Sequence, residues 1–398
     1  MRILILNAYY FPHMEGGAEF SVQILAENLA NKGHEVAVLS MDGNPSDNIS
    51  RPEIINGVKV YRSYSKSIYR RRIKKDKSHL SDKILNGLLS VYNPKMNRDV
   101  KKIIQLFNPN IIHTQNLVSM SYWIWKYAHK IGVPVVHTLR DYWLLDPTTN
   151  IGQSPTMLVI PFRIYHRYLS NKYVSVVTSP SNRTLEIFKD KGYFVNCEGI
   201  RIVNAISFSN EILKNSLSEK RQRKGKKVNF MYAGKLAENK GVKVLVEAFI
   251  KSNTDANLIM CGDGDLKNWI IEQNYCNIKL MGKLEQSQLF KEYKKADVLI
   301  VPSLWEEPFG RIVIEGAQYG LPIIGSDRGG IPEIIKELEF GSIYKADDVD
   351  ALAELIGIYS NREYLDNIIS NEPSNLVKYS ADNQTEMFES VYIKELEK

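Results

Sequence analysis

VPSLWEEPFGRIVIEGAQYGLPIIGSD, residues 301–327, carries the clearest secondary-structure signal in this sequence. Its first apolar run ends at Ser303, a loop containing Gly310 follows, and a helix with Glu315 on its second turn leads to the apolar run 322–327. Two short apolar strands joined by a helix are typical of a parallel sheet that is buried on both faces. The stretch therefore predicts an α/β fold.

The same alternation of apolar runs and amphipathic stretches continues along the chain in both directions. In residues 17–32, for example, Ala18, Val22, Leu25 and Leu29 form one apolar stripe at helical spacing. The stretches 240–253, 286–295 and 349–360 are predicted to be helices for the same reason, and RIVNA (201–205) is one of the strand candidates. About a dozen strand candidates are more than one open sheet commonly holds. We therefore predict two Rossmann-like, doubly wound domains that face each other across a cleft.

The domain boundaries are predicted from a polar, Ser-, Asn- and Lys-rich stretch at 205–227. We expect an N-terminal domain at 1–205 and a C-terminal domain at 206–378. The last helix, within 379–398, carries an apolar face and is expected to pack back on the N-terminal domain.

Composition places the chain among globular proteins. Of its 398 residues, 44% are hydrophobic and 24% are charged, which excludes disordered, collagen-like and coiled-coil chains. Three cysteines are too few for a disulfide scaffold, and no apolar run is long enough to cross a membrane. We expect a cytoplasmic protein, in part at the inner face of the cell membrane.

The net charge of +7 is concentrated in basic runs, chiefly 62–77 and 220–227. Such runs favour anionic partners. The 62–77 run has two open interpretations: it contacts an anionic membrane or lipid-diphosphate acceptor, or it is a solvated loop. Nucleic acid is not expected as a partner, because the runs lack interleaved stacking aromatics and a recognised binding module.

The 301–327 stretch also carries two candidate site carboxylates, Glu307 and Glu315. Eight residues along a helix axis span about 12 Å, which is near the length of an extended nucleotide-sugar. One carboxylate would then bind sugar hydroxyls and the other ribose hydroxyls, with backbone N–H groups facing a diphosphate between them. These N–H groups belong to Phe309, Gly310, Arg311 and Ile312. Alternatively, Glu307 is a helix-dipole partner and Glu315 is solvated.

Two glycine turns between a strand and a helix suit a phosphate. One is Gly16-Gly17 and the other is AGKLAENKG (233–241), where Lys235 and Lys240 flank the turn. Ordinary tight turns and solvated lysines are equally compatible with these patterns. Neither turn has a dinucleotide-binding or P-loop fingerprint.

Two histidines end predicted strands, where ligands bind in open α/β sheets. They are His113 in NIIH and His137 in VPVVH, and each can also be structural. Asp263 and Asp265 form a DxD pair, which we interpret as helix caps rather than a metal site. No metal and no bound cofactor are expected.

EPFGRIVIEGAQYGLPIIGSDRGGIPEII (307–335) resembles the Glu-(seven residues)-Glu signature of the retaining family 4 glycosyltransferases of GT-B fold. The resemblance covers nearly the whole chain. It includes the N-terminal Gly-Gly turn, the two His-ending strands, RIVNAIS near the interdomain junction, and MYAGKLAENKGVKVLVEAF.

This resemblance implies a donor site in the C-terminal domain and an acceptor site in the N-terminal domain. His137, Glu307 and Lys240 would be catalytic. Donor binding would involve Gly16, Gly17, Lys235, Lys240, Leu284, Glu307, Phe309, Gly310, Arg311, Ile312 and Glu315. Within this set, Glu307 would bind the sugar, Glu315 the ribose and the lysines the diphosphate.

Three residues depart from the family pattern. Position 235 is Lys where Arg is usual, Gln115 stands where a second His is frequent, and Ser207 replaces the usual Asp. A bidentate phosphate contact is lost at Lys235. The carboxylate pair is intact, so we expect activity.

The resemblance thus implies a metal-independent, retaining transfer of a sugar from a nucleotide-diphosphate sugar to a glycan or lipid-linked acceptor in cell-surface polysaccharide or glycolipid assembly. His113 and Asp141 are candidates on the acceptor side, with Asp141 a remote candidate nucleophile. The alternatives are a nucleotide-sugar epimerase or phosphorylase on the same fold, and a non-catalytic nucleotide-sugar binder.

Overall fold

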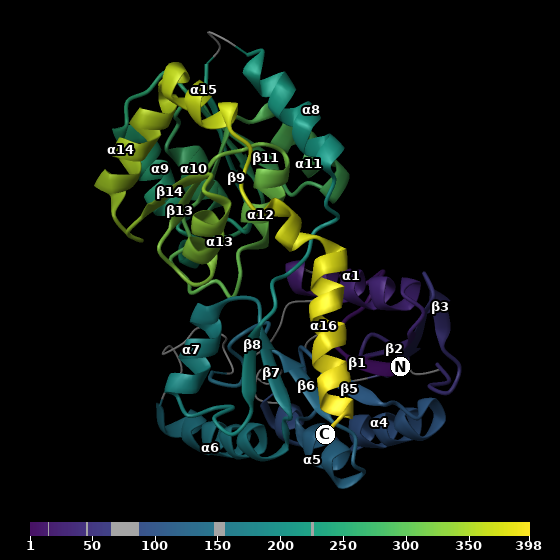
Figure 1. Ribbon diagram of the computed structural model, residues 1–398. Coiled ribbons are helices and arrows are strands. Elements are labelled where there is room, and N and C mark those ends of the chain that lie inside the picture. The colour runs from purple at the N-terminus through teal and green to yellow at the C-terminus, as the bar shows by residue number, and fades with distance from the viewer. Residues whose placement is uncertain (15, 45–46, 65–86, 147–155, 224–226) are drawn as a thin grey trace. The chain divides into compact units, whose positions relative to one another are not determined.

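The computed structural model describes residues 1–398 except 15, 45–46, 65–86, 147–155 and 224–226. The chain divides into two compact units (Figure 1). Unit 1 contains Met1–Ala205 together with Ala381–Lys398, and unit 2 contains Ile206–Ser380. Most of the 62–77 basic run lies outside the described residues.

Unit 1 is built on an eight-stranded sheet of order β3-β4-β2-β1-β5-β6-β7-β8. All neighbouring strands are parallel except β3 and β4. The strands are β1 (Arg2–Leu6), β2 (Glu35–Ser40), β3 (Glu53–Ile55), β4 (Val58–Arg62), β5 (Ile111–Thr114), β6 (Val135–Thr138), β7 (Val176–Ser179) and β8 (Glu198–Arg201).

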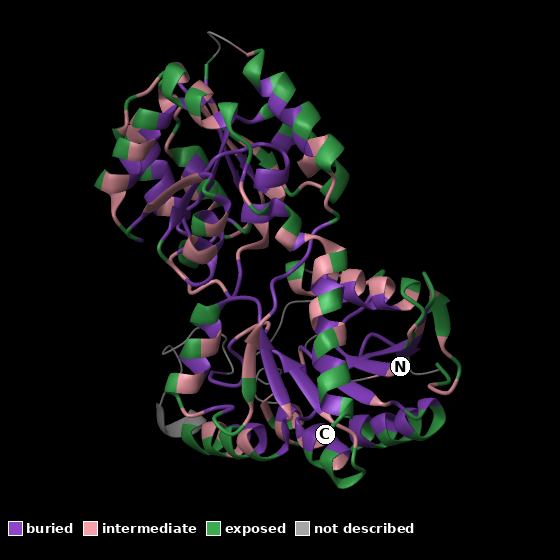
Figure 2. Cartoon of the chain, viewed as in Figure 1, coloured by how far each residue is buried: buried purple, intermediate pink, exposed green. Residues whose placement is uncertain are grey.

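Helices cover this sheet, and Figure 2 shows its central strands buried and the outer sides of the helices exposed. They are α1 (Gly17–Asn31), α4 (Pro94–Phe107), α5 (Trp123–Lys130), α6 (Thr156–Tyr173), α7 (Asn182–Asp190) and α16 (Ala381–Leu396). The last helix, α16, contributes Phe388 and Tyr392 to the core that also contains Ile3 and Val22. Glu389 fixes this position by contacts with Lys32 (2.9 Å) and His34 (2.6 Å).

Unit 2 has a six-stranded parallel sheet of order β11-β10-β9-β12-β13-β14. The strands are β9 (Asn229–Ala233), β10 (Asn257–Cys261), β11 (Ile278–Gly282), β12 (Val298–Val301), β13 (Ile323–Ser326) and β14 (Gly341–Tyr344). The four residues of β12 are all buried, as expected for a strand with helices on both faces of its sheet.

The helices of unit 2 follow its strands in alternation. The α-helices are α8 (Asn210–Arg221), α9 (Val242–Lys251), α10 (Lys267–Glu272), α11 (Gln286–Lys295), α12 (Arg311–Gln318), α13 (Ile331–Leu338), α14 (Val349–Ser360) and α15 (Arg362–Ser370). Two short 3₁₀ segments, η1 (Glu238–Lys240) and η2 (Leu376–Tyr379), complete the unit.

Both sheets are doubly wound, which confirms the predicted fold class. The strand order reverses between β1 and β5 in unit 1 and between β9 and β12 in unit 2. Ligands of open α/β sheets bind beyond the carboxyl ends of the strands at such a switch point. None of the helices in the described ranges has an apolar stretch that would reach across a bilayer.

Candidate active site

The two loops at the switch point of unit 2 are joined by their backbones. The Asn239 carbonyl, after β9, accepts the amides of Leu304 and Trp305, after β12, each at 3.1 Å. Gly241 has φ +70° and lies against Pro302, whose oxygen would be 1.8 Å from an added Cβ. Only glycine fits this approach, so the two loops hold a fixed spacing.

An ion pair between Lys240 and Glu307 crosses from one loop to the other. Their Nζ and Oε1 atoms are 2.5 Å apart, and the Ser303 hydroxyl donates to the same oxygen at 3.1 Å. The Lys240 ammonium also lies 4.6 Å from the centre of the Trp305 ring. Both charged side chains keep a solvent-exposed part, 26% for Lys240 and 18% for Glu307. A ligand can therefore reach a preformed pair of opposite charges.

The backbone of Glu307 is held by the turn that follows β13. The Gly330 amide donates to the Glu307 carbonyl at 2.8 Å. Gly329, with φ +58°, packs so closely that an added Cβ would lie 2.0 Å from the Glu307 oxygen. Glu307 is thus oriented by the carboxyl-end loops of β9, β12 and β13.

The N-terminus of α12 begins four residues after Glu307. Gly310 precedes the helix in a left-handed conformation. Its carbonyl accepts a hydrogen bond from the Val313 amide at 2.9 Å. The first amides of a helix have no acceptor within the helix, which makes them a site for an anion. Phe309 is buried, with its ring 6.1 Å from that of Tyr379.

The helix starts at Arg311, which confirms the expected loop through Glu307 and Gly310 followed by a helix with Glu315 on its second turn. The estimate of about 12 Å measured all eight residues along a helix axis and therefore does not apply. Four residue steps, or about 6 Å, separate Arg311 and Glu315 along the axis. The segment between Glu307 and Arg311 is a loop that contains Pro308 and Gly310. The physical reason is that the chain must reverse direction between the end of β12 and the start of α12.

Glu315 is not a freely solvated helix residue. Arg311 Nε donates to its Oε1 at 2.7 Å, and the Tyr293 hydroxyl donates to Oε2 at 3.3 Å. Burial, together with the nearby Glu315 charge, raises the pKa of Tyr293 well above its ordinary value. Tyr293 therefore stays a hydrogen-bond donor, and these two contacts position the carboxylate.

Other predicted donor residues lie in the same unit. Lys235 is exposed in the loop after β9, and Leu284 is half-buried after β11. Asp263 and Asp265 are exposed, and the residue before α10 is Leu266, without a side-chain cap. The expectation that the two aspartates cap this helix is therefore wrong; Asp263 instead accepts the Gly264 amide at 2.9 Å.

His137 lies in β6 of unit 1, surrounded by aromatic rings. Its Nδ1 is 2.9 Å from the Thr114 hydroxyl, which also accepts from Trp125 Nε1 at 3.0 Å. Its ring stacks on Phe194. Burial is the main cause that lowers the pKa of His137 to about 3. The imidazole is therefore neutral at ordinary pH and can take part only as a hydrogen-bonding group.

His113 lies on the opposite face of the sheet from His137, because Thr114, not His113, pairs with His137 in the register of β5 and β6. It is fully buried, and its ring nitrogens lie 2.7 Å from the hydroxyls of Tyr392 and Thr138. Both ring nitrogens therefore have partners within unit 1, and the expected place of His113 on the acceptor side stays a prediction. The position of a residue at a strand end predicts that it lies at the carboxyl edge of the sheet, but not on which face of the sheet its side chain lies.

Gly16, Gly17 and Asp141 follow the strands of unit 1. Gly17 begins α1, and the Gly16 amide donates to the Glu19 carboxylate at 3.0 Å. Asp141 lies after β6, and its carboxylate accepts the Trp143 amide at 2.8 Å. Burial raises the pKa of Asp141.

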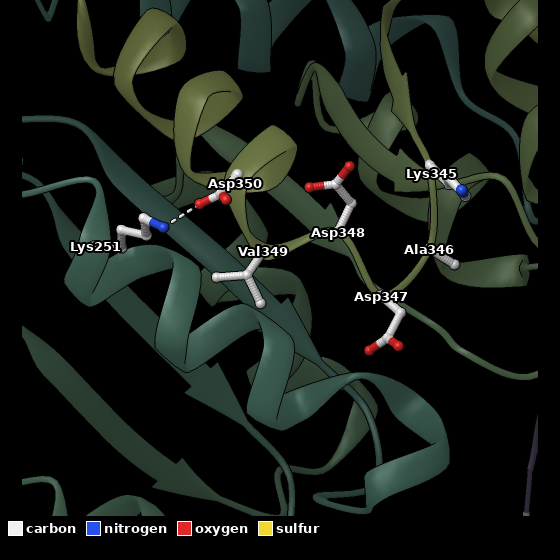
Figure 3. Close-up of a pocket in the computed structure, with 7 residues that line it drawn as sticks. All are labelled: Lys251, Lys345, Ala346, Asp347, Asp348, Val349 and Asp350. Carbon is white, nitrogen blue, oxygen red and sulfur yellow. Dashed lines mark ion pairs between the residues drawn. The ribbon is translucent and has the colours of Figure 1, made fainter.

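A separate hollow of about 480 Å³ contains none of the predicted residues (Figure 3). It lies at the start of α14, where Asp350 meets Lys251 while Asp347 and Asp348 point away from each other. Across the ranges that the structure describes, no three His, Cys, Asp or Glu side chains come together as potential metal ligands.

Sequence reasoning missed the residues that orient the predicted ones. Asn239, Ser303 and Trp305 hold Lys240 and Glu307, and Thr114 holds His137. Ser303 and Trp305 lie within the quoted 301–327 stretch. Their proximity to a loop more than sixty residues earlier depends on the strand order of unit 2, which the sequence pattern does not contain.

Two doubly wound Rossmann-like units are the architecture of the GT-B fold. Family models match both halves: "Glycosyltransferase Family 4" over residues 15–203 and "Glycosyl transferases group 1" over 214–375. The chain belongs to glycosyltransferase family 4 and is a glycosyltransferase, as its resemblance implied.

Individual proteins agree with this assignment. An uncharacterized 42.6 kDa protein in the cps region of Klebsiella pneumoniae is 31% identical over 88% of this chain and 91% of its own length. Sucrose-phosphate synthase from Thermosynechococcus elongatus has a TM-score of 0.77 at 18% identity, over 99% of this chain and 98% of the other. Anabaena HepE in complex with UDP-glucose has a TM-score of 0.69 at 17% identity, over 99% and 100%. These solved structures share the fold.

Proposed function

We propose that the protein transfers a sugar from a nucleotide-diphosphate sugar to a glycan or lipid-linked acceptor, with retention at the anomeric carbon and without a metal. The observation that carries this proposal is the Lys240–Glu307 pair beside the N-terminus of α12. A carboxylate, a cation and the N-terminus of a helix lie together at the switch point, which suits a ligand with both hydroxyls and phosphates.

Unit 2 would bind the donor along this row of groups. Glu307 would accept hydrogen bonds from sugar hydroxyls, and the amides of α12 would face the diphosphate. Glu315, held by Arg311 and Tyr293, would accept from the ribose hydroxyls. Leu284 would border the base.

Lys240 would stabilise the charge that develops as the bond between the anomeric carbon and the diphosphate breaks. The ammonium of Lys240 is paired with Glu307, so donor binding would exchange part of this contact for a phosphate. Lys235, exposed in the same loop, would add a second positive charge.

Retention would follow from attack on the same face that the leaving group departs. The acceptor hydroxyl would form the new bond to the anomeric carbon, and its proton would pass to the departing phosphate oxygen. His137 is neutral, so it would hydrogen-bond a sugar hydroxyl rather than supply a proton or a charge.

The names of relatives support the substrate class. HepE is described with UDP-glucose, which supports a nucleotide-sugar donor, and the Klebsiella protein belongs to a cps region, which supports cell-surface polysaccharide or capsule assembly. We propose action in the cytoplasm, with the acceptor at the inner face of the membrane.

The test is a panel of nucleotide-sugars assayed for release of the nucleoside diphosphate with glycan and lipid-linked acceptors. The expected result is turnover with one donor class, a product with the anomeric configuration of that donor, and full activity in EDTA. An inverted product would contradict retention, and loss of activity in EDTA would contradict the metal-free step. Interconversion of the nucleotide-sugar without acceptor would instead identify an epimerase.

A further inference from the structure

The outer face of α6 in unit 1 carries a row of exposed apolar side chains. Ile160, Ile164 and Tyr168 are 44%, 54% and 51% exposed. Their spacing of four residues places them along one side of the helix. His166 and Leu169, on the other side, are buried and already attach α6 to unit 1. The helix is therefore apolar on a face that the described residues of the unit leave exposed.

Basic residues border this row on both sides. Relative to Ile164, Arg167 is rotated about 60° in one direction and Lys172 about 80° in the other. Both are exposed, and the Lys172 ammonium lies 3.0 Å from the Tyr168 hydroxyl. This hydrogen bond is the main cause of a lowered pKa of Tyr168, to which the charge of Lys126 on α5 also contributes. We call Ile160, Ile164, Arg167, Tyr168 and Lys172 the α6 patch.

The apolar surface extends beyond α6 itself. Val195 is 52% exposed, and its amide donates to Asn171 on α6 at 3.0 Å. An exposed apolar side chain thus lies next to the C-terminal end of the row.

Basic residues outnumber acidic ones in the sequence on either side of the α6 patch, and the exposed acidic residue Asp190 of α7 lies two residues before Gly192, which is next to the Arg167 side chain. Between Asp99 and Glu186 the sequence contains two acidic residues, Asp141 and Asp146. Asp146 is fully buried, with Arg163 3.6 Å away, and neither α5 nor α6 contains Asp or Glu. Two copies of this patch would repel each other, so a second copy of the chain is a poor occupant.

We propose that the α6 patch docks on an anionic lipid bilayer, with Ile160, Ile164 and Tyr168 in the headgroup layer and Arg167 and Lys172 on lipid phosphates. An exposed apolar row flanked by basic residues is the pattern of helices that lie in the membrane interface. Tyrosine is favoured there, because its ring is apolar and its hydroxyl is polar. Each basic residue near such a surface strengthens binding about fivefold.

The test is flotation of the full chain with vesicles of phosphatidylcholine alone or mixed with phosphatidylglycerol. We expect binding to the mixed vesicles only. The double variant Ile164→Ser/Tyr168→Ser and the charge reversal Arg167→Glu/Lys172→Glu should each weaken binding about tenfold or more. Ile358→Ser, on α14, is the matched control because Ile358 is also exposed, at 38%, and it should bind like wild type. Equal thermal unfolding of all variants would show that they are folded.

A second readout reports insertion directly. Ile164→Trp should show a blue-shifted emission with mixed vesicles, and lipids brominated near the headgroup should quench it. No binding to mixed vesicles, or wild-type binding by both patch variants, would overturn the proposal. So would binding that only Arg70→Glu/Arg71→Glu/Arg72→Glu abolishes, because this result would assign the contact to the 62–77 run. None of these assays requires a donor or turnover, so the outcome is independent of the proposed reaction.

Discussion

The candidate groups at the carboxyl ends of the two sheets of this glycosyltransferase differ in charge. In unit 2, Lys240 and Glu307 are partly exposed and paired on loops that are joined by backbone contacts. In unit 1, His137 is buried among aromatic rings and held neutral. In the proposed function, unit 2 would therefore handle the charge of the diphosphate, while unit 1 would contribute a neutral hydrogen-bonding group.

The largest effect is expected from the charged pair. Lys240→Ala and Glu307→Gln should each lower kcat/KM about 100-fold or more, because transition-state charge and sugar contacts are lost. Lys243→Ala and Glu238→Gln are matched controls, since these residues form a more exposed ion pair in the same region. Steady-state kinetics would measure kcat/KM for each variant. If the control variants lost as much activity as the site variants, the Lys240–Glu307 pair would have no specific role in turnover.

The next effect concerns the backbone that spaces the two loops. Gly241→Ala should lower the free energy of unfolding by about 2–4 kcal/mol, because the added methyl group meets the Pro302 carbonyl. Gly357→Ala, in α14, is the control: its added Cβ meets no atom within 4 Å, and alanine favours the helix. Denaturant unfolding measures both, and equal stabilities would show that the loop spacing is not fixed by this contact.

The neutral state of His137 gives a prediction for pH. With a folded pKa of about 3 and an ordinary value near 6.5, the unfolded chain binds more protons between these pH values. Stability is therefore lost as pH falls below about 6.5, and His137→Gln should reduce that loss by about 1–2 kcal/mol at pH 5. Unfolding at pH 5 and pH 7 would measure it. An unchanged pH dependence would mean that His137 is charged or accessible in the fold.

The smallest effect tests the place of His113. Tyr392→Phe removes the hydroxyl next to His113 Nδ1 and should cost about 1 kcal/mol of stability, as for a buried hydrogen bond. Thermal unfolding and acceptor KM would be measured together. An acceptor KM that rose several-fold would support a place for His113 at the acceptor site.

Much of the fold could be predicted, because buried strands and amphipathic helices leave periodic patterns. The helices expected at 286–295 and 349–360 coincide with α11 and α14. A strand expected at 201–205 instead occupies Glu198–Arg201, whose residues are exposed or half-buried, so no continuous apolar run marks it. The β14 edge strand, which starts at Gly341, was missed for the same reason.

The sequence allowed the residues of the candidate site to be predicted, but not the contacts between them. The helix expected from residue 240 begins at Val242, because Lys240 belongs to a 3₁₀ turn and Gly241 to a left-handed one. That turn brings Lys240 to Glu307. Only the adjacency of β9 and β12 reveals this contact, just as only the register of β5 and β6 reveals which histidine faces which side.

Calorimetric titration of nucleoside diphosphates into the full chain tests the central claim most directly. We expect one of UDP, GDP or ADP to bind, with affinity about tenfold lower in Lys240→Ala and unchanged in Lys243→Ala. Absence of binding by all three, or equal affinity in both variants, would contradict a diphosphate site at the β9–β12 switch point.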